Sequence, residues 1–300
     1  MNVSFSSLAD ALRMGVSASA ESSVPVRVAV LVDAGASSFI VDAVRGALVP
    51  HTTTSLVRVA ALTSTAPVLK DDTDVALVLQ GSSQRAEAAA RAIAISGVPA
   101  VVLAESCVEA PSIERDTPLL GLVCATDSAH LLNQLSHWIL DRTDKGTAFA
   151  AAFPFMRVPA AYDVVRSCCA SNMLTGALAF VPGADYPVMC AAEVAMMLKL
   201  SHIFGKRVSH ERAYDAVAIC ACGALLRAIA KRVAPLAGRA SFVVKAGIAG
   251  AGTAAVGCAL SRLYQSDFSY ERLDEGILKL VSSIKSAFSA SDGAVIPDRI

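Results

Sequence analysis

The sequence predicts an α/β protein in which a domain built on a parallel sheet is followed by an all-α domain rich in Ala and Gly. The first half alternates short Val- and Leu-rich runs with helix-like stretches, a pattern typical of βα units around a parallel sheet. The second half consists of long apolar stretches with helical breaks. At 300 residues, the chain is long enough for two domains that each bury a core.

Shifts in composition divide the chain into four segments. We expect an N-terminal arm at 1–24, the α/β domain at 25–145, the helical domain at 146–270, and a C-terminal helix and tail at 271–300. The charged stretch Asp141–Lys145 is expected to link the two domains. Residues 1–24 carry one basic residue and no long apolar run, so they do not resemble a secretory signal.

The composition argues against a nucleic-acid partner and suggests an additional apolar contact. Lys and Arg number 26 and Asp and Glu number 26, so no net charge draws the chain to nucleic acid. Hydrophobic residues make up 54% of the chain and charged residues 17%, which is more apolar than an ordinary soluble domain. The eight cysteines show no zinc-like spacing, so we interpret them as reduced core residues in a cytosolic setting and expect no metal or other cofactor.

Five strands are expected in the first half, each apolar enough to be covered on both faces. They are Val26–Val32, Ser55–Leu62, Asp74–Gln80, Val98–Leu103 and Leu119–Cys124. Helices are expected at Ser38–Leu48, at Ser83–Ser96 and at Ser128–Leu140, the last with Asp127 or Ser128 as its N-cap.

The loop after the first strand is where such folds hold a nucleotide phosphate. Here residues 33–38 contain Gly35 but no Lys, and they match neither the GxxxxGK[ST] nor the GxGxxG pattern. The favoured interpretation is a tight strand-to-helix turn. The alternative is weak anion binding at the helix N-terminus by Gly35, Ser37 and Ser38.

Four consecutive stretches carry a resemblance to a known family. They are Asp74–Gly81 (DVALVLQG), Gly97–Ser106 (GVPAVVLAES), Leu119–Asp127 (LLGLVCATD) and the helix Leu131–Leu140. In order and apolar pattern they resemble the later strands and closing helix of an Era-like small GTPase. The resemblance implies that the first half is a degenerate GTPase-like, Rossmann-like domain. Ala104, Glu105 and Ser106 stand where that family has its guanine-reading NKxD motif, and no DxxG sequence lies between Leu62 and Asp74. GTP hydrolysis is therefore not expected, because positioning and neutralising the phosphates are most of that catalysis.

Residues Val164–Asp267 carry a second resemblance, through three ordered stretches. They are Met173–Asp185 (MLTGALAFVPGAD), Ala191–Val208 (AAEVAMMLKLSHIFGKRV) and Lys245–Tyr264 (KAGIAGAGTAAVGCALSRLY). These stretches are similar to the helical domain of unknown function numbered six-nine-seven, which follows small GTPase domains and occurs in bacterial inner-membrane proteins. The resemblance implies a location at the inner membrane; it implies no activity.

Three or four helices are expected in this half. Pro182 and Gly183 break the first apolar run. The helices expected after this break are Glu193–Phe204, which Gly205 ends, a helix from Ser209 to about Arg232, and Phe242–Tyr264. The last has small residues on two adjacent sides, so another helix can approach closely, including one from a second copy of the chain.

Two interpretations of these helices stay open. Ser167–Ala184 is free of charge but broken at Pro182, and Ala246–Leu260 is free of charge but shorter than a membrane span of about 20 residues. The helices therefore either associate with a membrane, as hairpins or in its interface, or form a soluble bundle. Basic residues between the apolar stretches would face the cytoplasm in the first case. They are Lys199, Lys206, Arg207 and Arg212.

The sequence lacks a recognisable catalytic motif. Its histidines form no HExxH or paired metal spacing, and no GxSxG motif occurs. Asp185 and Glu193 lie in apolar surroundings, so each is a candidate functional carboxylate or a satisfied structural one.

These observations favour a non-catalytic scaffold or adaptor. Its helical half would meet the inner membrane or partner helices, its partner protein is unidentified, and it would lie at the cytoplasmic face of the inner membrane or in the cytoplasm. One alternative is a nucleotide-responsive, GTPase-like switch. Another is a small-molecule-binding α/β domain, which predicts a closed apolar pocket near Asp33, Gly81 and Glu105.

Overall fold

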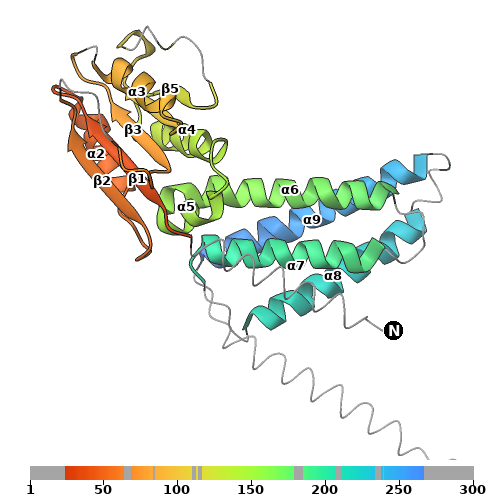
Figure 1. The fold of residues 1–300 in the computed structure, drawn as a ribbon. Helices are drawn as coiled ribbons and strands as arrows, with labels where there is room; N and C mark the ends of the chain where they lie inside the picture. The colour runs from red at the N-terminus through yellow and green to blue at the C-terminus, as the bar shows by residue number, and fades with distance from the viewer. Residues whose placement is uncertain are drawn as a thin grey trace, which may run out of the picture.

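The computed structural model shows an α/β unit joined to a bundle of long helices (Figure 1). The structure describes residues 24–63, 69–83, 85–109, 113, 117–178, 185–206, 211–233, 238 and 240–266. The expected arm before Val24, the break at Pro182 and Gly183, and the expected segment 271–300 lie outside the described residues.

The α/β unit is built on a five-stranded sheet in which every neighbouring pair of strands is parallel. The strands are β1 (Arg27–Val32), β2 (Leu56–Ala61), β3 (Val75–Leu79), β4 (Ala100–Ala104) and β5 (Leu120–Cys124). Each lies within a residue or two of its expected range, so the predicted fold class is confirmed.

The strand order is β2-β1-β3-β4-β5, one of the two common orders of doubly wound sheets. The order reverses between β1 and β3, and ligands of such sheets bind in the crevice beyond this point. Helices α2 (Ser38–Ala47) and α4 (Ser128–Leu140) cover one face, where Val30 and Leu77 are buried. Helix α3 (Arg85–Ile95) covers the other face, over Val78.

Local signals set the ends of these elements. The side chain of Asp127 accepts a hydrogen bond of 3.0 Å from the backbone N–H of His130, so Asp127 is the N-cap of α4, as expected. A short 3-10 turn, η1 (Cys107–Glu109), follows β4. After α4 the chain turns at 141–145 and enters α5 (Gly146–Ala152) and a second 3-10 turn, η2 (Pro154–Met156).

The second half contains four long helices that run as two hairpins (Figure 1). They are α6 (Arg157–Leu178), α7 (Asp185–Ile203), α8 (Glu211–Val233) and α9 (Ser241–Gln265). Helix α7 begins eight residues before the expected Glu193, and Pro187 falls in its first turn, where proline is tolerated. Gly205, with a φ of 68°, follows its end as the C-cap signal predicted.

Glycines let α9 lie close against α6. A Cβ atom added at Gly250 would lie 2.4 Å from Cγ of Met173, and one added at Gly257 would lie 2.6 Å from a methyl carbon of Val165. Side chains of α6 therefore occupy the space above the α9 backbone, as the small residues of this helix predicted.

One apolar core runs from the sheet into the bundle. Phe149 of α5, with Phe153 and Met156 beside it, is completely buried in the same cluster as Leu135 of α4 and Leu200 of α7. The rings of Phe149 and Phe153 lie 6.2 Å apart between centroids. This junction fixes the bundle against one face of the α/β unit.

Replacement of Phe149 by Ala is expected to lower the free energy of unfolding by about 3–5 kcal/mol, because it opens a cavity where the sheet and bundle meet. Denaturant unfolding followed by circular dichroism measures this change. Ile95→Ala is the matched control, since Ile95 is 86% exposed and its loss should change stability by no more than about 0.5 kcal/mol. A loss at Phe149 as small as that at Ile95 would contradict the shared core.

Candidate functional site

The carboxyl edge of the sheet is the first candidate site, and Asp33 lies at its centre. This carboxylate is only 2% exposed at the end of β1. Its Oδ1 accepts the backbone N–H of Ala34 at 2.9 Å, and its Oδ2 accepts the hydroxyl of Ser83 at 2.6 Å. Asp33 therefore joins the loop after β1 to the loop after β3.

These two loops are also in close backbone contact. A Cβ atom added at Gly81 would lie 2.4 Å from the carbonyl oxygen of Ala34 and 3.0 Å from the backbone nitrogen of Ala36. Gly35 has a φ of 76°, a conformation that favours glycine, and Ser82 donates to the Ala34 carbonyl at 3.4 Å. At this part of the switch point the chain itself fills the space where a ligand would approach.

At the anion site that the sequence offered as an alternative, a serine hydroxyl already binds a carboxylate. Ser37 is the N-cap of α2, but its hydroxyl donates to Glu105 at the end of β4 and makes no hydrogen bond to the amides of the helix. Ser38, the first residue of α2, is exposed, as is Gly35. Anion binding by these three residues stays a prediction, and the two carboxylates beside it oppose a negative ligand electrostatically.

Two cysteines meet at the same edge. The thiol of Cys124, at the end of β5, is hydrogen-bonded to that of Cys107 in η1. Burial, together with Cys107 and Glu109 beside it, raises the pKa of Cys124 to about 12, so this thiol is protonated and a poor nucleophile. Cys168 and Cys190 are buried as expected, but Cys107, Cys222 and Cys258 are exposed, so the prediction of core cysteines is wrong for these three.

Two cavities lined by described residues lie elsewhere. One opens between α2 and α4, beside Asp42, His51 and Phe155. The other lies at the amino edge of the sheet and is lined by charged residues. Neither is lined by Asp33, Gly81 or Glu105, where the small-molecule alternative requires an apolar pocket.

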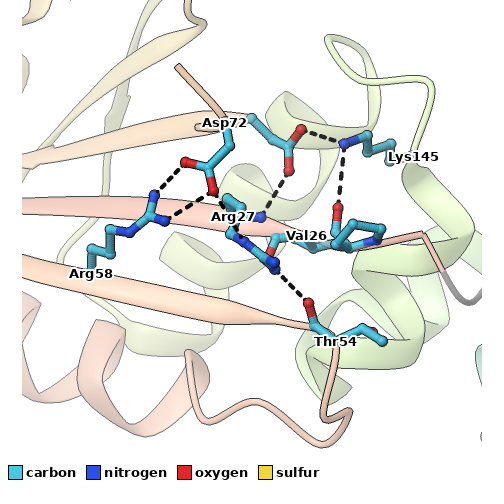
Figure 2. Close-up of polar contacts among 8 residues, drawn as sticks. Val26, Arg27, Thr54, Arg58, Asp72 and Lys145 are labelled. Carbon is cyan, nitrogen blue, oxygen red and sulfur yellow. Dashed lines mark hydrogen bonds and ion pairs between the residues drawn. The ribbon is translucent and has the colours of Figure 1, made fainter. Parts of the chain in front are cut away.

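The charged cavity at the amino edge is a set of ion pairs (Figure 2). Asp74, just before β3, binds Nζ of Lys145 at 2.6 Å and accepts the backbone N–H of Arg27 at 2.8 Å. Lys145 also donates to the carbonyl of Pro25 at 3.3 Å. These contacts fasten the start of α5 to the first strand.

Asp72 forms the second half of this cluster (Figure 2). Both its oxygens accept hydrogen bonds from Arg58, at 2.7 and 3.0 Å, and Arg27 lies 3.4 Å away. The hydrogen bond from Arg58 lowers the pKa of Asp72 to about 2. Both carboxylates are thus held by cations, which fits a structural role.

The second candidate site is a buried polar triad within the bundle, formed by Asn172 of α6, Glu193 of α7 and Thr253 of α9. The Thr253 hydroxyl donates to Oε1 of Glu193 at 2.8 Å, and Nδ2 of Asn172 lies 2.8 Å from the Thr253 hydroxyl and 3.4 Å from Oε1. All three residues are at most 3% exposed. Burial raises the pKa of Glu193, and the two hydrogen bonds only partly offset it.

The sequence identified one member of this triad. Glu193 lies in apolar surroundings as expected, and the backbone of Asp185 begins α7, but the side chain of Asp185 lies outside the described residues. Asn172 and Thr253 were not identified, and neither was the buried pair in which Tyr264 donates to Asp215 at 2.8 Å. The only signal for them is a lone polar residue within an apolar helix.

Comparisons with protein-family models, with curated proteins and with solved structures return no match for this chain.

Replacing Glu193 by Gln is expected to remove a pH-dependent loss of stability. Burial raises the pKa of Glu193 in the folded state, so the folded protein binds this proton more tightly than the unfolded chain does. In the unfolded chain the pKa of Glu is about 4.3. The free energy of unfolding therefore falls as the pH rises from that value through the raised pKa of the folded state. The Gln variant should therefore become progressively more stable than the wild type between pH 4 and pH 8, as measured by denaturant unfolding. Asp42→Asn, on the exposed face of α2, is the control and should retain the wild-type trend; parallel curves for Glu193→Gln would contradict the assignment.

Proposed function

We propose that this protein is a non-catalytic scaffold or adaptor that associates with a membrane through its helical half. The observation that carries the proposal is a group of exposed apolar side chains at the end of the bundle farthest from the sheet. They are Met173, Leu174, Val188, Leu225, Ile229, Val233, Phe242 and Val243. A group of this kind is typical of a protein or membrane contact.

The carboxyl edge of the sheet supports the non-catalytic part of the proposal. Asp33 and Glu105 place carboxylates at the switch point, whereas a nucleotide site needs groups that neutralise phosphate. The α/β unit then serves as a rigid surface for a partner protein, with the shape of a degenerate GTPase-like domain.

Helix α9 supports the membrane part. Among the described residues it is the one helix long and apolar enough to cross a bilayer, although such a helix also occurs in the core of soluble proteins. Because α9 packs along α6 and α8, we favour contact with the membrane surface over a full span. The proposal includes the location that the sequence resemblance of residues Val164–Asp267 implies, at the cytoplasmic face of a bacterial inner membrane.

Fractionation of cells that express the full chain tests this proposal. We expect the protein in the membrane pool, retained in high salt and released by detergent, because apolar contacts are not screened by salt. Recovery of the whole chain in the soluble pool would contradict membrane association.

Titration calorimetry with GTP and GDP separates the adaptor from the nucleotide switch. We expect no heat of binding for either nucleotide with magnesium present, because carboxylates stand where the phosphates would lie. Saturable binding would favour the switch. Asp33→Asn and Glu105→Gln, which remove these charges, show whether any binding occurs at the carboxyl edge.

A further inference from the structure

We propose that the distal end of the bundle docks on an anionic bilayer, with its apolar side chains in one leaflet and its basic residues on acidic headgroups. The distal end is defined here as residues 173–178, 185–192, 225–233 and 241–252. The inference rests on the proposed function and adds the docking face and the class of lipid.

Contacts between helices place these four segments at one end. The polar triad joins α6, α7 and α9 at the level of Asn172, Glu193 and Thr253, and a Cβ atom added at Gly252 would lie 2.2 Å from a methyl carbon of Leu226 in α8. The parts of the helices beyond this level point away from the sheet together (Figure 1).

All four described helices have exposed apolar side chains on the distal side of the triad, whereas on the side nearer the sheet the exposed large ones are Val158 and Tyr162 of α6. Beyond it, Leu174 is 60% exposed, Val188 is 58% exposed, and Phe242 and Val243 are each 55% exposed. On the side nearer the sheet, the same helices bury large apolar side chains in the core. They include Val165, Met197, Leu200 and Leu260.

Charge identifies the lipid class. In the sequence of the four distal segments there are four basic residues, Arg227, Lys231, Arg232 and Lys245, and one acidic residue, Asp185. The side chains of Arg232 and Lys245 are exposed beside Val233, Phe242 and Val243. In a chain with no net charge, these segments therefore carry three more basic than acidic residues next to exposed apolar side chains, the combination that binds anionic lipid surfaces.

The length of the distal end fits one leaflet. From Ser241 to Thr253, α9 rises about 18 Å at about 1.5 Å per residue, whereas a hydrocarbon core is about 30 Å thick. The buried Glu193 lies at the inner limit of this segment and marks where the polar interior of the bundle begins.

Vesicle flotation of the purified full chain tests the proposal. The vesicles contain phosphatidylcholine alone or phosphatidylcholine with phosphatidylglycerol. We expect binding to the anionic vesicles, a loss of about fivefold for each of Arg232→Gln and Lys245→Gln, and a loss of about tenfold or more for Phe242→Ser with Val243→Ser.

The matched control is Val158→Ser with Tyr162→Ser. These side chains are 58% and 63% exposed on α6 at the end near the sheet, so their replacement should leave binding unchanged. Thermal unfolding of each variant confirms that it folds.

Each contrary result has a separate meaning. Equal binding to both vesicle types would overturn the assignment of anionic lipid. Equal losses for the control and distal variants would overturn the docking face, even if the chain fractionates with cell membranes. A chain that fractionates with membranes but binds neither vesicle, or whose distal variants only convert an oligomer into a monomer, would assign the distal end to a protein partner or a second copy. A soluble chain in cells contradicts the proposed function itself.

Discussion

The burial of Phe149, Phe153 and Met156 between the α/β unit and the bundle is the constraint on which the arrangement of the molecule depends. Each fully buried side chain of this size contributes about 1.5–3 kcal/mol. The partly exposed ion pair between Lys145 and Asp74 at the same junction contributes about 0–1 kcal/mol. Apolar packing therefore sets the direction of the bundle, and the ion pair secures its edge.

The loops at the carboxyl edge of the sheet are held together by hydrogen bonds between their own side chains. A doubly wound sheet brings the loops after β1, β3 and β4 together whatever their side chains. Here Asp33 and Glu105 use that convergence to bind the hydroxyls of Ser83 and Ser37. The hydrogen bonds hold the loops in place of a ligand, which is a structural use of the switch point.

The sequence predicted elements more reliably than contacts. The apolar runs located all five strands, and the N-cap at Asp127 located the start of α4, because these signals are local. The partners of Glu193 could not be predicted, since Asn172 lies 21 residues away and Thr253 lies 60 residues away in the chain. The charged stretch 141–145 was expected to be a linker between two domains, and composition alone gave no sign that Phe149 continues the core beyond it.

The polar triad supplies what the small residues of the bundle lack. Helices that meet through Ala and Gly can come close together, but these small residues do little to fix the position of one helix along another. When the packing of a core becomes less specific, a protein loses its single well-defined arrangement before it loses stability. A shift of α6, α7 or α9 by one turn would leave Asn172, Glu193 or Thr253 buried without a partner, at a cost of about 1–3 kcal/mol each. The triad therefore fixes three helices at one level. Helix α8 packs against α9 through Leu226 and Gly252, so the fourth helix is positioned by its contact with a helix that the triad fixes.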